Sequence, residues 1–196
     1  EAGNSGGTRG AYSQIGNGGV ENTGARTGNV TVRAAQDVIV EAGENAGDYA
    51  EIGHGSLVAG AASTGDVRVS AGTGSFTGVA PGMFNDLGDF DGTVGADTIT
   101  FAATTPGMGK VRLLGGIAGS SDSWAVIGHV GRDSGGTKTG LIDVKAVDDI
   151  DVLAGNGARA FAMIGHGGRS SDGTNGGSIT LTSLSGNLTV SGGSGS

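Results

Sequence analysis

Residues 27–43, TGNVTVRAAQDVIVEAG, contain two short runs in which apolar and polar residues alternate. Val30, Val32 and Ala34 fall on one face of the first run, and Thr31 and Arg33 fall on the other. A period of two is typical of a β-strand with one buried face. The second run, DVIVEAG at 37–43, has the same period. This stretch therefore predicts two strands that meet at a short corner.

Both runs recur along the chain. The first returns as TGDVRVSA (64–71), TGLIDVKA (139–146) and GGSITLTS (176–183), and the second as DIDVLAG (149–155) and NLTVSGG (187–193). In an irregular third unit, DTITFAA (97–103) and GKVRLLGG (109–116) fill the two places, so Ile99 and Phe101 are expected in register with Val67 and Val69. The second unit lacks a clear final run.

A third recurring piece is an aromatic residue followed three and four positions later by Ile or Leu and by Gly. Its aromatic residues are spaced by 37, 35, 40 and 37 residues, which gives five units. The aromatic positions are Tyr12, Tyr49, Phe84, Trp124 and Phe161. We place the units at about 1–43, 44–82, 83–116, 117–155 and 156–196, in a single domain.

A unit of about 37 residues with three short strands and glycine-rich corners cannot bury its apolar face alone. Stacked copies bury it when each strand pairs in parallel with its equivalent in the next unit. The sequence therefore predicts an all-β parallel β-helix, a solenoid of about five coils with three short strands each. Its interior is expected to hold one column of branched residues beside the corner glycine, namely Ile15, Ile52, Leu87, Ile127 and Ile164.

Three histidines follow that glycine, at His54, His129 and His166, where the other units have Asn17 and Asp89. A short polar side chain at each place can bond a bent backbone, so we interpret the column as a structural corner ladder. Metal coordination by stacked histidines and catalysis are the alternatives. The aromatic column is likewise expected to stack for stability, with sugar binding as its alternative.

Composition narrows the function classes. The net charge of −8 argues against nucleic-acid binding, and no stretch is apolar enough to insert in a membrane. The chain has 44 glycines without a three-residue period, which excludes collagen. The absence of cysteine excludes disulfides and thiolate metal sites, and is compatible with export in an unfolded state.

The pattern aromatic-Ala-x-Ile-Gly-His-Gly, followed by a polar loop and Gly-(Asn/Asp)-Val-x-Val-x-Ala, resembles the repeats of large secreted bacterial adhesins. These are the filamentous-haemagglutinin-like and autotransporter-passenger proteins. The resemblance covers all five units, is strongest at 27–56 and 139–169, and weakens at 74–93. It implies a right-handed β-helix in an extracellular, rod-shaped, non-enzymatic protein that mediates attachment or builds a surface fibre.

Other candidate sites lie in the irregular unit and in the loops. Asp86, Asp89, Asp91 and Asp97 offer oxygen ligands for calcium but match neither the EF-hand loop nor the nonapeptide of calcium-binding β-rolls, so solvated acids are the default interpretation. Asp143, Asp148, Asp149 and Asp151 alternate with apolar residues and are expected on the outer face. The loops at 19–27, 56–64, 130–139 and 168–176 vary between units, and are the expected contact surface for a cell-surface glycan or a matrix component.

No localised set of carboxylates with Arg or Lys emerges, so an enzyme is not expected. The sequence begins and stops at the same phase of the repeat and shows no cap. This predicts either a segment of a longer rod or end-to-end stacking of copies. The leading hypothesis is a structural fibre or adhesin segment without a cofactor. A carbohydrate-binding or polysaccharide-degrading β-helix and a calcium-stabilised binding module are the alternatives.

Overall fold

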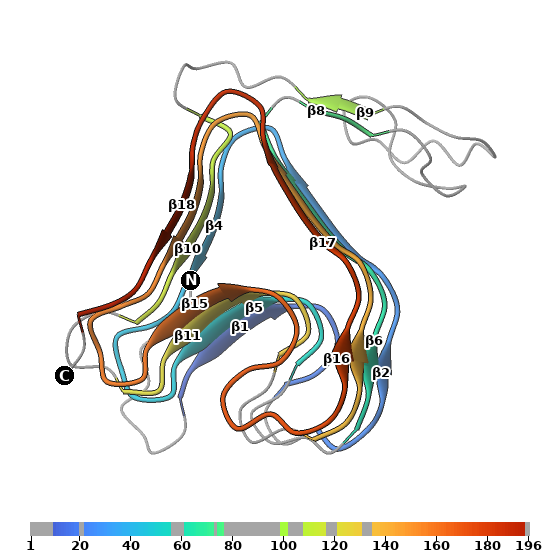
Figure 1. Ribbon diagram of the computed structural model, residues 1–196, viewed down its shortest axis with the longest axis vertical. Helices are drawn as coiled ribbons and strands as arrows, with labels where there is room; N and C mark the ends of the chain where they lie inside the picture. Colours follow the sequence, from blue (N-terminus) through green and yellow to red (C-terminus); the bar gives the residue numbers. More distant parts are fainter. Residues whose placement is uncertain are drawn as a thin grey trace.

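The computed structural model describes residues 10–19, 22–55, 61–72, 74–76, 99–101, 108–116, 121–130 and 135–194. Those residues form strands and connections only, and no helix. Four parallel sheets of four strands each stand side by side around a common axis. In Figure 1 the path runs along β15, up through β16 and β17 and down through β18, with the C-terminal coil nearest the viewer. The fold is a right-handed parallel β-helix, as predicted.

The first sheet carries the aromatic piece of the repeat and the third and fourth sheets carry the two alternating runs. The first sheet contains β1 (Tyr12–Ile15), β5 (Tyr49–Ile52), β11 (Trp124–Ile127) and β15 (Phe161–Ile164). The third contains β3 (Val30–Ala34), β7 (Val67–Ala71), β13 (Ile142–Ala146) and β17 (Ile179–Ser183). The fourth contains β4 (Val38–Glu41), β10 (Val111–Leu114), β14 (Ile150–Leu153) and β18 (Leu188–Ser191).

The second sheet consists of two-residue strands that sequence reasoning had assigned to variable loops. It contains β2 (Arg26–Thr27), β6 (Ser63–Thr64), β12 (Lys138–Thr139) and β16 (Asn175–Gly176). Each coil therefore has four strands rather than three.

The core fills the triangle enclosed by the first, third and fourth sheets, which is visible in Figure 1. Strand pairing keeps equivalent residues in register, so that Ile52 lies between Ile15 and Ile127, and Ile127 pairs in turn with Ile164. The same holds for Val67 between Val30 and Ile142 in the third sheet. Each column thus stacks one side chain on its equivalent and excludes water from the axis.

The structure differs from the predicted five coils, because each sheet holds only four strands. Strand β5 pairs directly with β11, which places Tyr49 opposite Trp124 and leaves no place for Phe84 and Leu87 between them. Strand β10 pairs directly with β4, so GKVRLLGG supplies the final strand that the second coil had lacked. Phe84 and Leu87 themselves lie outside the described residues.

The expected register of Ile99 and Phe101 with Val67 and Val69 is wrong. Both belong to β9 (Ile99–Phe101), which pairs antiparallel with β8 (Gly74–Phe76). A glycine explains the difference: Gly65 in the second coil has φ +137°, and a Cβ there would collide with the carbonyl of Gly28 in the coil before it. The equivalent position in DTITFAA is Asp97, whose side chain is incompatible with that corner.

Candidate functional site: the corner between the first and second sheets

Both faces of the first sheet are covered. Its inner face adds Ala50, Ile52, Ala125 and Ile127 to the main core. Its outer face adds Tyr49, Trp124 and Val126 to a second apolar cluster that also contains Val130, with Phe161 and Met163 packed at its edge. All four residues of β5 and of β11 are consequently buried. In these two middle strands the conspicuous residues of the repeat therefore lie inside the molecule and not on its surface.

The aromatic residues form a continuous stack on that outer face. The ring centroids of Tyr12 and Tyr49 are 5.1 Å apart, those of Tyr49 and Trp124 4.9 Å, and those of Trp124 and Phe161 5.9 Å, all within 9° of parallel. Tyr49 and Trp124 are buried, and burial raises the pKa of the Tyr49 phenol far above its usual value. Both faces of these two rings are occupied by neighbouring rings, so neither is available to stack on a sugar.

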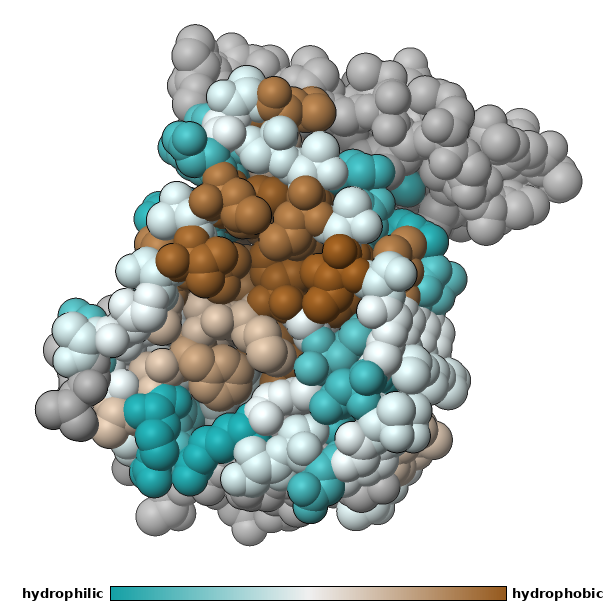
Figure 2. Space-filling model, viewed as in Figure 1, coloured by the Kyte–Doolittle hydropathy of each residue, from teal (hydrophilic) through white to brown (hydrophobic). Residues whose placement is uncertain are grey.

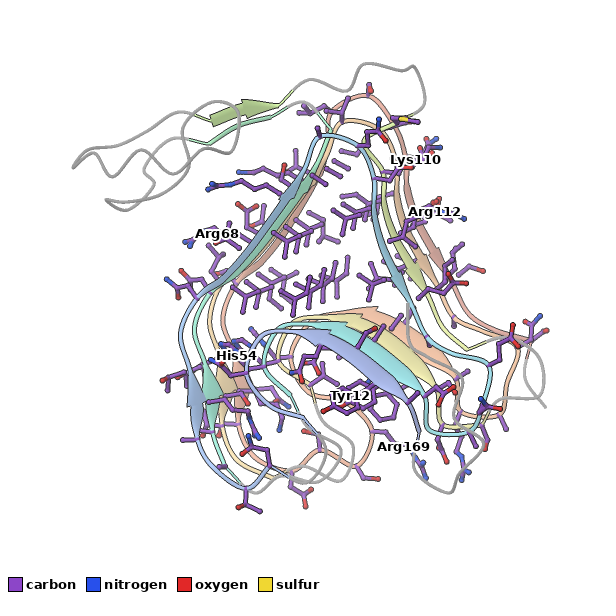
Figure 3. All side chains as sticks on the ribbon, turned by 180° about the vertical axis from the view of Figure 1, so that it is seen from behind. Tyr12, His54, Arg68, Lys110, Arg112 and Arg169 are labelled. Atoms are coloured by element: carbon purple, nitrogen blue, oxygen red, sulfur yellow. The ribbon has the colours of Figure 1, made fainter. Side chains whose placement is uncertain are left out.

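The histidines form a second stack at the corner. The rings of His54 and His129 are 5.0 Å apart, as are those of His129 and His166. The Nε2 atoms of His54, His129 and His166 lie 2.8, 2.8 and 3.0 Å from the carbonyl oxygens of Gly28, Gly65 and Gly140. A carbonyl only accepts, so each Nε2 carries the proton. Figure 3 shows His54 at this corner, beside the second sheet.

The opposite ring nitrogen accepts a backbone N–H from the coil before it. Asn17 N–H donates to His54 Nδ1 at 2.9 Å, and His54 N–H donates to His129 Nδ1 at 3.2 Å. This pattern fits neutral imidazole, and burial lowers the pKa of His129 to about 4. For His54 and His129 both ring nitrogens are therefore used by the backbone, which leaves no lone pair for a metal.

The first coil satisfies the same corner with an amide. Asn17 Nδ2 donates to the carbonyl of Thr27 at 3.1 Å, next to the glycine whose carbonyl His54 contacts. The Asn17 amide N–H therefore takes the role that the Nε2–H of the imidazole has in the other coils. Asp89, the predicted equivalent in the third unit, lies outside the described residues, as do Asp86, Asp91 and Asp97.

Sequence reasoning missed a buried carboxyl beside these columns. Glu51 is buried on the outer face of β5, and burial raises its pKa to about 8. The backbone N–H of Val130 donates to it, and one carboxyl oxygen, Oε1, has no hydrogen-bond partner. Its equivalents are Gln14, Val126 and Met163. Three of the four residues in this column are uncharged, which is the available signal of a buried face. The signal was missed because the outer face of the first sheet was not expected to be covered.

Two buried cations of the second sheet were missed as well. Arg26 donates from Nε to Ser63 Oγ at 3.0 Å and through its terminal nitrogens to the carbonyls of Asn22 and Ala61. Lys138, two strands further along the same column, donates to Ser171 Oγ at 2.8 Å. Burial lowers the pKa of both side chains. These bonds join the two cations to Ser63 in β6, to Ser171 and to loop carbonyls, so they tie neighbouring coils and loops to the second sheet.

The outer faces of the third and fourth sheets carry paired charges. Asp143 pairs with Lys145 at 3.0 Å, Asp149 with Lys110 at 2.6 Å and Asp151 with Arg112 at 3.4 Å. Asp148 lies 3.5 Å from the same Lys110. Figure 3 shows Arg68 and Arg112 pointing outward from two different sheets. Such exposed pairs contribute little to stability, and they are spread over the rod surface without converging.

Comparison with known proteins found no matching family model, no similar curated protein and no similar solved structure. Within the described ranges no three His, Cys, Asp or Glu side chains lie close enough together to hold a metal ion. The same part of the chain contains no helix that could span a membrane. The arrangement of the corner therefore has to be interpreted from its own chemistry.

Proposed function

We propose that this chain is a structural, non-enzymatic segment of a secreted, rod-shaped surface fibre or adhesin. The observation that supports the proposal is the use of its polar columns. Histidine, asparagine and buried arginine and lysine side chains all bond to backbone or hydroxyl groups of the same or the next coil. Residues that hold coils together in this way contribute stiffness and register, and none of these contacts leaves a reactive group facing solvent.

The polar corners repeat this role elsewhere in the solenoid. Asn29 Oδ1 accepts the backbone N–H of Asp66 at 2.9 Å, and Asp66 Oδ1 accepts that of Leu141 at 3.0 Å. These are again bonds from one coil to the next. A side chain that accepts a backbone N–H from the adjacent coil fixes the stacking distance and the register together. A rod built in this way suits a protein that must present a surface at a distance.

Secretion is proposed because the chain has no cysteine and because its repeat resembles that of secreted bacterial adhesins. Attachment to a glycan or matrix component would use the outer faces of the sheets and the variable loops between the first and second sheets. The two end coils are also proposed to contact further coils of the same kind, because apolar residues that are buried in the middle coils are exposed there.

The proposal is tested with three measurements on the purified chain. Electron microscopy should show rods of uniform width, and a panel of acidic and neutral polysaccharides should remain undegraded after incubation. Beads coated with the chain should be retained on a glycan or matrix array when uncoated beads are not. Degradation of any polysaccharide would instead support the enzymatic alternative, and a rise in melting temperature on adding calcium would support the calcium-stabilised one.

A further inference from the structure

The two end coils expose residues whose equivalents are buried in the middle coils. At the C-terminal coil Leu188 and Val190 are 53% and 73% exposed, and Ile179 is exposed beside them. Figure 2 shows this face, with a continuous apolar patch in the centre of the triangle. At the N-terminal coil Tyr12 and Ile15 are exposed, and an open hollow is lined by Ser13, Ile15, Val32 and Val40 among others.

The two faces match each other residue by residue. If the C-terminal coil were followed by the N-terminal coil of another copy, Phe161 would stack on Tyr12 and Ile164 on Ile15. In the same register Leu181 would meet Val32, and Val190 would meet Val40. Each of these pairings places together the residue types that already neighbour each other inside the chain, as Trp124 with Phe161 and Ile127 with Ile164. The apolar columns would continue without a step.

Charges do not oppose this contact. Strands β15 to β18 contain no charged residue. Arg33 and Glu41 in the N-terminal coil would therefore lie over Thr182 and Ser191, their neutral equivalents in the C-terminal coil. Between these strands no like charges would meet, and such a meeting would cost association free energy.

The polar corner supplies a directional match. Inside the chain the backbone N–H at this corner donates to the side chain at the same corner of the following coil, from Asn17 to His54 and from His54 to His129. Asn17 uses its Nδ2 for Thr27 and has Oδ1 left to accept. The backbone N–H of His166 has no acceptor within the described residues. A following copy would bring Asn17 Oδ1 to that N–H.

The corner between the third and fourth sheets offers a second match of the same kind. Asp37 Oδ1 accepts the N–H of Lys110 from the following coil, and Asp149 Oδ1 accepts that of Asn187. The side chain of Asn187 also bonds to Asp149, which leaves Asn187 Oδ1 for the coil beyond. In a following copy Asp37 would lie next to Asn187 in this column, and its backbone N–H would donate to Asn187 Oδ1.

We propose that a second copy of this chain stacks head to tail on the C-terminal coil and continues all four parallel sheets. Asn17 of the second copy accepts the N–H of His166, and Asn187 accepts the N–H of Asp37 of that copy. This rests on the proposed function as a rod. Because the contact joins two different faces and preserves the strand direction, it repeats without closing and produces a filament.

A disulfide test reports the register directly, because the chain has no cysteine of its own. Ser13, Ala50, Ala125 and Ala162 form one column of small residues, with Ser13 and Ala162 at its two ends. Neighbouring strands lie about 4.8 Å apart, within reach of a disulfide. The double variant Ser13→Cys with Ala162→Cys should give a ladder of multimers on a non-reducing gel after mild oxidation. The single variants Ser13→Cys and Ala162→Cys should stay monomeric on that gel.

The polar contacts are tested by sedimentation of Asn17→Ala with Asn187→Ala, which should weaken association about tenfold or more. The matched control is Asn156→Ala, whose Oδ1 bonds Ser194 within the chain. A disulfide dimer of Ala162→Cys alone would show tail-to-tail contact and overturn the proposal. So would a double cysteine variant that has the circular dichroism of a β-protein but stays monomeric. In that last case rods seen in material isolated from its natural source would leave the proposed function standing, with another partner covering the end coils.

Discussion

The middle coils and the end coils are built from the same columns of residues and yet keep them in different surroundings. Ile127 is completely buried, whereas Ile15 in the same column is 52% exposed; Val152 is 6% exposed, whereas Val190 in its column is 73% exposed. In a solenoid, burial is therefore a property of the neighbouring coil more than of the residue. The same substitution at two levels of one column should consequently have very different effects.

The largest effect is expected for Ile127→Asp. It places a charge without a partner between Ile52 and Ile164, and should cost about 4 kcal/mol or more of the free energy of unfolding. Ile15→Asp is the matched control, because its carboxylate remains partly in water. Thermal unfolding followed by circular dichroism should show the first variant unfolded or nearly so and the second folded. Equal losses in the two variants would show that the end coil is covered in solution.

A gain in stability is expected for Glu51→Gln. The folded pKa of Glu51, about 8, lies above the ordinary value of 4.5. Its contribution to stability is therefore most favourable below pH 4.5 and declines as the pH rises to 8, by something on the order of 5 kcal/mol. The first coil already has the neutral equivalent, Gln14. Denaturant unfolding at pH 5 and pH 9 should show the variant gaining stability mainly at pH 9. An equal gain at both values would assign the effect to packing.

A smaller pH effect is expected from His129, and it runs in the opposite direction: stability is lost as the pH falls. Its folded pKa, about 4, lies below the ordinary value of 6.5. The stability it contributes is present above pH 6.5 and is lost as the pH falls from 6.5 to 4, by about 3 kcal/mol at most. His129→Asn, the residue found at position 17, should be less stable at pH 7 because it fills less space, but should lose less on acidification. Unfolding curves at pH 7 and pH 4.5 measure the difference, and a variant with undiminished acid sensitivity would contradict this assignment.

Period-two alternation was enough to predict the third and fourth sheets, because each of their runs has one buried face. It failed for the third unit, where the aromatic spacing agreed but the sequence has Asp97 at the position where the corner needs glycine. The missing Thr-Gly pair before Ile99 was the available signal that these residues belong to an insertion. The second sheet could not be found by periodicity, because two residues do not define a period.

The candidate site was only partly predictable for a related reason. The histidine and aromatic columns stand out because the residue types repeat. Glu51 is the only acid in its column, and Arg26 and Lys138 share a column with Ser63 and Asn175, so no residue type repeats at these positions. A strand usually has one face toward solvent in an antiparallel sheet, but a parallel sheet is commonly covered on both. Applying that rule to β5 would have identified Glu51 as a buried acid.

The smallest effect on stability is expected for Val190→Lys, compared with Val152→Lys in the same column. Val152→Lys and Val190→Lys place the same side chain in one column, one coil apart. The ammonium of the first must enter the core, and the protein should unfold. The ammonium of the second lies at the open C-terminal face, so the melting temperature of the dilute protein should change little. Its effect should appear in association instead, because head-to-tail stacking would bury that charge against Val40 of the next copy. Sedimentation over a range of concentrations should therefore show a folded protein that stays monomeric at concentrations where the unsubstituted chain elongates. If Val190→Lys elongates as readily as the unsubstituted chain, the C-terminal face is not the contact surface.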